Sequence, residues 1–305
     1  QMGEWERERL KKHSEEIDST SSYRASMYYQ KYLTDFLTSI GKKDIPLEEV
    51  TEDFGKSYKA HLKKCKNFGV SQTNHCLRWL NRLLYLAVDK EILRVNPCED
   101  LEYEPKPEAR HRYISREDFK KILSTPMYDK RMELARRAFI FSTLTGLAYA
   151  DIMLLHPHHI GTNADGRRYI RINRKKTKVE AFIPLHPIAE RILSLYNTTD
   201  DEKPVFPLPN RDALWFEVHE LGITIGKEEN LTYHQSRHSF GTFLISAAIP
   251  IESIAKMMGH SNIRTTQGYA RITDDKISKD MDKLMERRKK VSAGEKKKKQ
   301  KIIIK

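Results

Sequence analysis

Residues 234–269 contain four side chains suited to phosphoryl transfer: His234, Arg237, His260 and Tyr269. A tyrosine hydroxyl can act as a nucleophile toward a phosphodiester. Arg237 has a planar, permanently charged guanidinium that can bind two oxygens of one phosphate, and the histidines can transfer protons or donate hydrogen bonds. No cluster of acidic residues accompanies them. This set therefore predicts phosphoryl transfer that runs without a divalent metal ion, and no cofactor is predicted.

The spacing of these residues predicts how they are held. His234 and Arg237 lie three residues apart at the expected start of a helix, with Thr232 as its cap, so they share one helix face. A helix N-terminus also favours a bound anion. His238 follows His234 by four residues, a spacing found in metal sites, but no third ligand is evident and no metal site is predicted.

The chain has 305 residues, enough for two domains with separate cores, and a formal net charge of +13. Much of this charge is at the C-terminus. Residues 283–305 contain eleven Lys or Arg and two Glu, a net +9, which leaves +4 for the rest (13 − 9 = 4). We expect residues 291–305 to be a disordered basic tail that adds only non-specific affinity for phosphates. Net charge alone does not establish DNA binding.

Other sequence features concern the cellular compartment. No apolar run is long enough to cross a membrane, and the first residues are charged, unlike a signal peptide. Cys65, Cys76 and Cys98 are odd in number and irregularly spaced, which favours reduced thiols over disulfides or a zinc site. These features predict a cytoplasmic protein that does not bind membranes. In a bacterium, it is expected at the nucleoid.

The pattern along the chain predicts two domains. Residues 104–110 contain two prolines within three residues, which favours an extended linker. Residues 1–103 are expected to be all helical. Apolar residues three and four apart predict a helix that ends near Gly41, a second over 51–66 and a third from Ser71. Residues 10–16 are expected to form only a lead-in.

The second domain, residues 111–290, is expected to be mainly α-helical with one small antiparallel sheet. Alternation over 169–173 predicts a strand that pairs with another over 179–184, and Asp165-Gly166 is a turn signal before them. Helices are expected from Ser115 and over about 131–145, 148–155, 187–196, 211–222, 233–248, 251–258, 262–269 and 274–290.

Several segments together resemble one family. Residues 231–270, with HQSRHSFGTFLI and IESIAKMMGHSNIRTTQGYA, look like the C-terminal half of a tyrosine recombinase (phage integrase family) catalytic domain. FSTLTGLAYADIMLL (141–155) is similar to the first arginine motif of the family, and RKKTKVEAFIPL (174–185) to its β-hairpin lysine motif. LAVDKEILRVNPC (86–98) resembles the end of its helical, SAM-like core-binding domain. The chain resembles integrases of conjugative or mobilisable transposons more than the recombinases that resolve chromosome dimers at cell division.

The resemblance implies a role for each matching residue. Tyr269 matches the nucleophile that forms a 3′-phosphotyrosyl bond, and Lys176 matches the lysine that protonates the leaving 5′ oxygen. Arg237 matches the second phosphate-binding arginine. His234 matches the histidine of proton transfer, and His260 matches a residue that contacts the scissile phosphate.

The chain departs from the family at one catalytic position. Where the family has its first arginine, directly after Thr-Gly-Leu, this chain has Ala148. Asp151 still matches the acidic residue three positions later. In the family this residue holds the catalytic side chains in place and does not itself contact the DNA. Either the protein is a weakened or non-cleaving DNA binder, or another arginine enters the site. If residues 174–178 stay extended, Arg174 lies on the same face as Lys176, so we predict that Arg174 compensates for Ala148.

The resemblance also implies partners. The expected partner is double-stranded DNA with specific core sites, bound by a protein that is monomeric when free and tetrameric on two synapsed sites, with strands exchanged through a Holliday junction. DNA-bending or excision factors could assist.

The predicted function is integration or excision of a mobile element. The alternatives are relaxation of supercoils in the manner of a type IB topoisomerase, or a non-cleaving regulator. Because such integrases often carry an N-terminal arm-binding domain, the chain is expected to be a truncated form.

Overall fold

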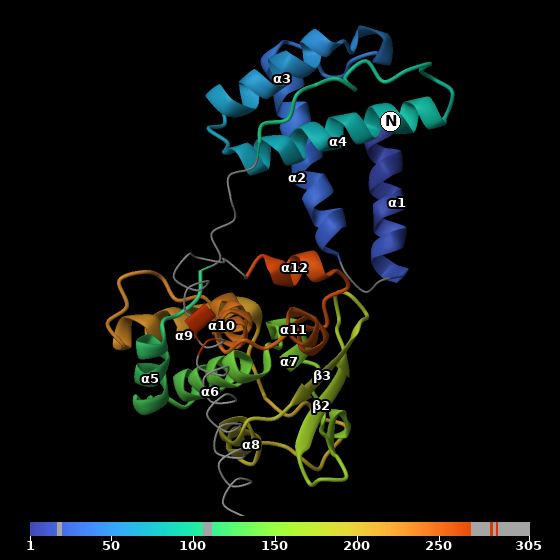
Figure 1. The fold of residues 1–305 in the computed structure, drawn as a ribbon. Coiled ribbons are helices and arrows are strands. Elements are labelled where there is room, and N and C mark those ends of the chain that lie inside the picture. Colours follow the sequence, from blue (N-terminus) through green and yellow to red (C-terminus); the bar gives the residue numbers. More distant parts are fainter. Residues whose placement is uncertain (17–19, 106–111, 270–280, 283–284, 286–305) are drawn as a thin grey trace, which may run out of the picture. The chain divides into compact units, whose positions relative to one another are not determined.

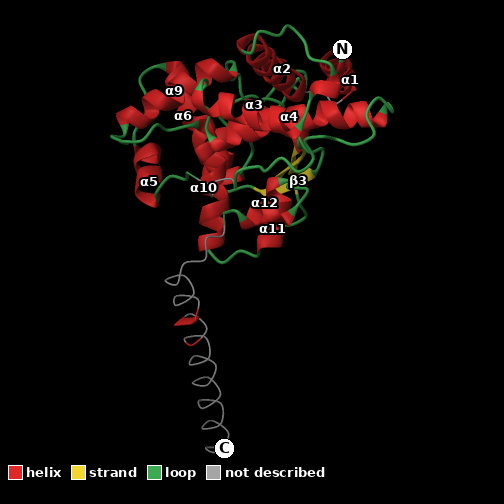
Figure 2. Cartoon of the chain, turned by 90° about the horizontal axis from the view of Figure 1, so that it is seen from above, coloured by secondary structure: helices red, strands yellow, loops and turns green. Residues whose placement is uncertain are grey.

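The computed structural model describes residues 1–16, 20–105, 112–269, 281–282 and 285. It divides into two compact units, residues 1–109 and 110–305 (Figure 1). Most of the predicted linker, most of the predicted helix over 274–290 and the predicted basic tail lie outside the described residues. Helices dominate both units, and the strands occupy one small region of the second (Figure 2). None of the helices in the described ranges is long and apolar enough to span a membrane.

The N-terminal unit consists of helices that pack around α4. Its elements are α1 (Met2–Glu16), α2 (Ser21–Ser39), the short 3-10 turn Leu47–Glu49, α3 (Glu52–Lys64) and α4 (Val70–Asp89). α1, α2 and α3 all contact α4. The apolar side chains that α4 repeats every three or four residues, Leu77, Leu80 and Leu84, are buried against them. This pattern drives the packing because each buried leucine removes apolar surface from water.

The prediction for residues 10–16 is wrong. They are the end of α1, a helix of 15 residues. Met2 and Glu6 of this helix are buried. The Glu6 carboxylate pairs with Arg9 at 2.8 Å and also with Arg82 of α4. α1 is thus stabilised by tertiary contacts, and its weakly amphipathic sequence does not reveal them.

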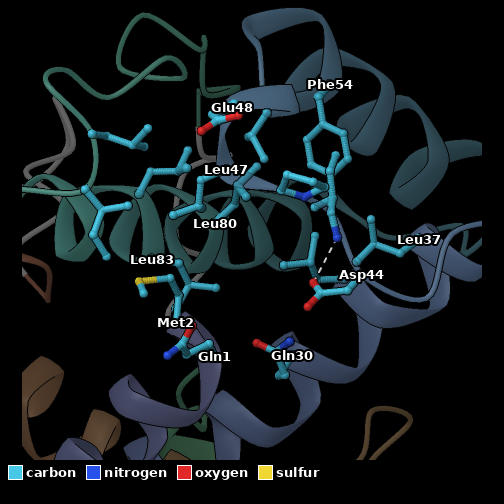
Figure 3. Close-up of a pocket in the computed structure, with 18 residues that line it drawn as sticks. Gln1, Met2, Gln30, Leu37, Asp44, Leu47, Glu48, Phe54, Leu80 and Leu83 are labelled. Carbon is cyan, nitrogen blue, oxygen red and sulfur yellow. Dashed lines mark hydrogen bonds between the residues drawn. The ribbon is translucent and has the colours of Figure 1, made fainter.

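A cavity of about 560 Å³ opens in the N-terminal unit, between the start of α1, α2 and α4 (Figure 3). Its lining is mostly apolar, with Leu37, Phe54, Leu80 and Leu83 among the labelled side chains. None of the residues predicted to carry chemistry lines it.

The second unit is built around α6, a helix that is buried on most of its surface. Its helices are α5 (Arg116–Ser124), α6 (Lys130–Thr145), α7 (Tyr149–Ile152), α8 (Pro187–Leu193), α9 (Arg211–Thr224), α10 (Tyr233–Ser246), α11 (Ile251–Met258) and α12 (Ile263–Gln267), with a 3-10 turn at Pro157–His159. α6 contacts α5, α8, α9 and α10. The Asp129 side chain caps α6, and Gly146, with φ of +71°, ends it. α7 is shorter than the predicted helix over 148–155: it ends at Ile152, with Met153 as its C-cap.

The sheet has three antiparallel strands in the order β1 (Ile160–Thr162), β2 (Arg168–Asn173) and β3 (Glu180–Pro184). The predicted pairing of the last two is confirmed, with Ile170 opposite Ile183 and Ile172 opposite Ala181. These four side chains are buried, and α11 packs on β3. β1 was not predicted, because three residues are too few to show alternation; the Asp165-Gly166 turn joins it to β2.

Candidate active site

α10 carries the first two chemical residues on its opening turns. The helix begins after Thr232, whose N–H donates to Gln235 Oε1 at 2.6 Å. Arg237 is on the inner side of the helix, with 3% of its surface exposed, whereas His234 is exposed. Neighbouring groups still shield part of the His234 ring from water. This partial desolvation, followed by the positive charges of Arg237 and Arg174, lowers the pKa of His234. His234 is therefore mainly neutral at pH 7 and able to accept a proton.

The Arg237 guanidinium connects α10 to two other segments, the end of α6 and the end of α11. It donates to the Gly146 carbonyl at the end of α6, to the Met258 carbonyl at 2.8 Å, and to His260 Nε2 at 2.8 Å. Burial, and then the charge of Arg174, lower the pKa of Arg237 to about 10. It stays charged at neutral pH, but its charge is poorly solvated, and such a charge favours a bound anion.

His260 follows Gly259, which takes the left-handed conformation (φ +58°) and ends α11. An arginine can only donate hydrogen bonds, so His260 Nε2 accepts from Arg237 and the ring proton is on Nδ1. Nδ1 then donates to the Thr266 hydroxyl at 2.7 Å. Burial, followed by the charges of Arg237 and Arg174, lowers the pKa of His260 to about 4. His260 is thus a neutral imidazole with a fixed tautomer.

Tyr269, just beyond α12, is 9% exposed and packs into the same site. Its ring stacks on His260 at a centroid distance of 6.2 Å and contacts His238 at 5.3 Å. α10 comes so close that a Cβ built on Gly241 would lie 2.9 Å from Tyr269 Cδ2. Burial raises the pKa of Tyr269, while the charges of Arg237 and Arg174 oppose the rise. The phenol is therefore held next to cations that can stabilise its deprotonated form.

The β2–β3 connection brings in a second guanidinium. Arg174 is 7% exposed, and its Nε donates to the buried Asp151 carboxylate at 2.8 Å. The other carboxylate oxygen of Asp151 accepts from the Lys175 backbone N–H at 3.0 Å. Arg174 is close enough to Arg237, His260 and Tyr269 to affect their titration.

The path predicted for residues 174–178 is wrong. β2 ends at Asn173, and residues 175–177 form a turn, so Arg174 and Lys176 do not share a strand face. Arg174 points inward to Asp151, whereas Lys176 is exposed. Lys176 nevertheless contributes to lowering the pKa of His234, so its charge acts on the site from the rim. Ala148 is the residue before α7, three positions from Asp151.

The structure thus gathers His234, Arg237, His260, Tyr269, Asp151 and Arg174 around one site, with Lys176 at its edge. Sequence reasoning missed Thr266, Thr177 and the contact of His238 with Tyr269. Thr266 lies three residues before Tyr269, a spacing that could have suggested it, whereas Thr177 contacts the Gly259 carbonyl, 82 residues away. Among the residues that the structure describes, no group of His, Cys, Asp or Glu could hold a metal ion.

The chain thus has a helical unit, followed by a mainly helical unit with a small sheet. The second unit holds a buried tyrosine beside two arginines. A comparison with known families shows to which class of protein these features belong. Residues 112–276 match the Phage integrase family, and residues 4–104 match the Phage integrase SAM-like domain. The chain therefore belongs to the phage integrase family. It is a tyrosine recombinase, a DNA strand-transferring enzyme of site-specific recombination, as the sequence predicted.

Individual relatives agree with this assignment. The chain is 26% identical to tyrosine recombinase XerC of Haemophilus influenzae (strain PittEE) over 224 residues, which is 69% of this chain and 74% of the relative. It is 23% identical to the ICEBs1 integrase of Bacillus subtilis (strain 168) over 310 residues, covering 88% and 79%. In fold it is similar to the Tn1549 transposon integrase bound to transposon right end DNA, with a TM-score of 0.60, 20% identity and coverage of 85% and 93%.

Proposed function

We propose that the protein is the integrase of a mobile element and that it cuts and rejoins DNA through a 3′-phosphotyrosyl bond to Tyr269. The observation that carries this proposal is the burial of Tyr269 beside two guanidinium groups, Arg237 and Arg174, with Asp151 as the carboxylate on Arg174. Two desolvated cations beside a nucleophile form a site for an anion whose charge grows during reaction. A scissile phosphate in duplex DNA meets this description.

In the proposed reaction the Tyr269 oxygen attacks phosphorus, and the bond from phosphorus to the 5′ oxygen breaks. The phenol proton passes to a base, for which the neutral His234 is suited. Lys176 gives a proton to the leaving 5′ oxygen. Arg237 binds the non-bridging oxygens, and His260, whose two ring nitrogens already bond to Arg237 and Thr266, holds that guanidinium in place. Because one phosphoester replaces another, a 5′-hydroxyl from a second strand can reverse the step without ATP.

Arg174 is proposed to supply the guanidinium that Ala148 lacks. Its support is positional: it is buried, its Nε is bound to Asp151, and it lowers the pKa values of Arg237 and His260. The opposite view, that Ala148 marks a non-cleaving DNA-binding regulator, predicts a site with one arginine. A second buried arginine next to Tyr269 favours the active enzyme.

The finer parts of the proposal concern DNA and assembly. Residues 1–103 are proposed to bind core-site DNA together with residues 111–290, and four copies to exchange strands between two sites in the bacterial nucleoid. Fold relatives support the kind of substrate, since the Tn1549 integrase binds transposon right end DNA and a lambda integrase dimer binds a core site. The names of the Tn1549 and ICEBs1 integrases support a mobile element.

A strand-exchange assay tests the proposal. Purified protein is mixed with a labelled linear DNA and a supercoiled plasmid that both carry the end junction of the element. Joint molecules that disappear with Tyr269→Phe support an integrase. Relaxation of the plasmid without joint molecules would favour a topoisomerase, and binding without either product would favour a regulator.

A further inference from the structure

The turn between β2 and β3 has an unusual, closed conformation. Arg174 N–H donates to the Val179 carbonyl at 3.0 Å, and Lys178 N–H donates to the Arg174 carbonyl at 2.9 Å. Lys178 has a φ of +56°, which is uncommon for a residue with a side chain. Such a turn is kept only where other contacts favour it.

Three contacts tie this turn to the rest of the unit, and they lie on both sides of Lys176. On one side, Arg174 Nε and Lys175 N–H both donate to Asp151, at 2.8 and 3.0 Å. On the other side, the Thr177 hydroxyl donates to the Gly259 carbonyl at 3.1 Å. Lys176 itself is exposed. The turn is therefore fixed beside Lys176, while the lysine side chain points out from it.

The acceptor of the Thr177 bond belongs to the turn that carries His260. Gly259 also packs directly on Arg174, since a Cβ at this glycine would lie 2.5 Å from Arg174 Cδ. The next residue, His260, bonds to Arg237 and stacks on Tyr269. Thr177 thus joins the turn that bears Lys176 to the segment that contacts the nucleophile.

We propose that Thr177 is a positioning residue for the general acid: its bond to the Gly259 carbonyl holds the turn so that Lys176 reaches the leaving 5′ oxygen. This inference depends on the proposed function. In the step concerned, the bond from phosphorus to the 5′ oxygen breaks while the Tyr269 oxygen bonds to phosphorus. The Lys176 ammonium gives one proton to the 5′ oxygen and becomes a neutral amine.

The chemistry of the leaving group separates this role from a general structural one. An alkoxide leaving group needs a proton, because its conjugate acid is very weak, whereas a thiolate can leave without one, because a thiol has a pKa near 8.5. A DNA substrate with sulfur in place of the bridging 5′ oxygen therefore does not need Lys176. Any variant that acts only through Lys176 should recover on this sulfur substrate.

The experiment measures covalent protein–DNA adducts on matched oxygen and sulfur substrates. Lys176→Ala is expected to lose roughly 10²–10⁴-fold on oxygen, the usual contribution of a general acid, and to recover on sulfur. Thr177→Val is expected to lose about 10–10²-fold on oxygen, because small misplacements have effects of this order, and to come within about two-fold of the wild type on sulfur. Thr177→Ser keeps the hydroxyl and should behave as wild type.

The control is Thr224→Val on the exposed face of α9, where the hydroxyl bonds only within its own helix. It should leave both rates unchanged. Equal losses by Thr177→Val on oxygen and sulfur, or no loss on either, would overturn the positioning role. If the wild type forms no adduct on either substrate, the proposed function itself fails. If the wild type forms adducts but Lys176→Ala does not recover on the sulfur substrate, Lys176 is not the general acid.

Discussion

Arg174 and Asp151 form a buried ion pair between the β2–β3 turn and α7, with 2.8 Å between Nε and the carboxylate oxygen. Asp151 lies three residues after Ala148, where the family has its first arginine. The carboxylate therefore faces a guanidinium that comes from another part of the chain. Because Asp151 is 1% exposed, leaving its charge unpaired would be costly, and this pairing directs Arg174 into the site.

Arg174→Ala is expected to lower the rate of covalent adduct formation by about 10²–10³-fold, the usual effect of losing a preorganised donor to the transition state. Asp151→Asn should also lower the rate, by releasing Arg174 from its position. The matched control is Arg171→Ala on the same hairpin, because Arg171 is exposed and pairs only loosely with Glu180 at 3.8 Å. Adduct formation by Arg174→Ala at the wild-type rate would show that Arg174 does not compensate for Ala148.

Gly259 is expected to tolerate no side chain, for two separate reasons. Gly259 and Gly166 both have positive φ values, +58° and +76°, but only Gly259 faces Arg174. Gly166→Ala should lower the free energy of unfolding by about 1–2 kcal/mol from backbone strain alone. Gly259→Ala should lower it by a further ~1–3 kcal/mol from overpacking and should also slow adduct formation. Chemical denaturation measures the first effect, and equal losses for both variants would contradict the close packing on Arg174.

The pH dependence of stability should reveal the low pKa of His260. In the unfolded chain a histidine has a pKa near 6.5, whereas in the folded protein the pKa of His260 falls to about 4. Between these values the unfolded chain binds more protons, so the free energy of unfolding should rise as pH increases from 4 to 6.5. His260→Gln keeps an acceptor for Arg237 but removes this titration.

The measurement compares urea unfolding of the wild type and His260→Gln across pH 4.5–7. The variant should show a smaller gain in stability over this range. Identical gains would mean that His260 titrates normally and that the neutral tautomer bonded to Arg237 and Thr266 is incorrect.

Local patterns predicted much of the fold. Residues 251–258 form α11 with the expected bounds, and the alternation over 169–173 marks β2. Both follow from side-chain periodicity, because a helix or strand that buries one face must repeat apolar residues on that face. α1 was missed because its stability depends on Glu6 pairing with Arg82, 76 residues away. Such contacts leave no local signal.

The site was predicted less completely. The types and order of the residues near Tyr269 pointed to phosphoryl transfer, and the structure brings them together. The direction of Arg174 was inferred from a strand that in fact ends at Asn173, so Arg174 reaches the site through a turn. The partner of Thr177 is a backbone carbonyl, and a backbone acceptor cannot be identified from the type of any residue.

The most direct test of the proposed mechanism is to trap the covalent intermediate at Tyr269. A DNA substrate nicked close to the cleavage position loses a short fragment after attack, so the adduct cannot be reversed. The proposed mechanism predicts a protein–DNA adduct whose peptide map places the DNA on Tyr269. Tyr269→Phe should form no adduct although it still binds the DNA. An adduct on another residue, or one that persists in Tyr269→Phe, would contradict it.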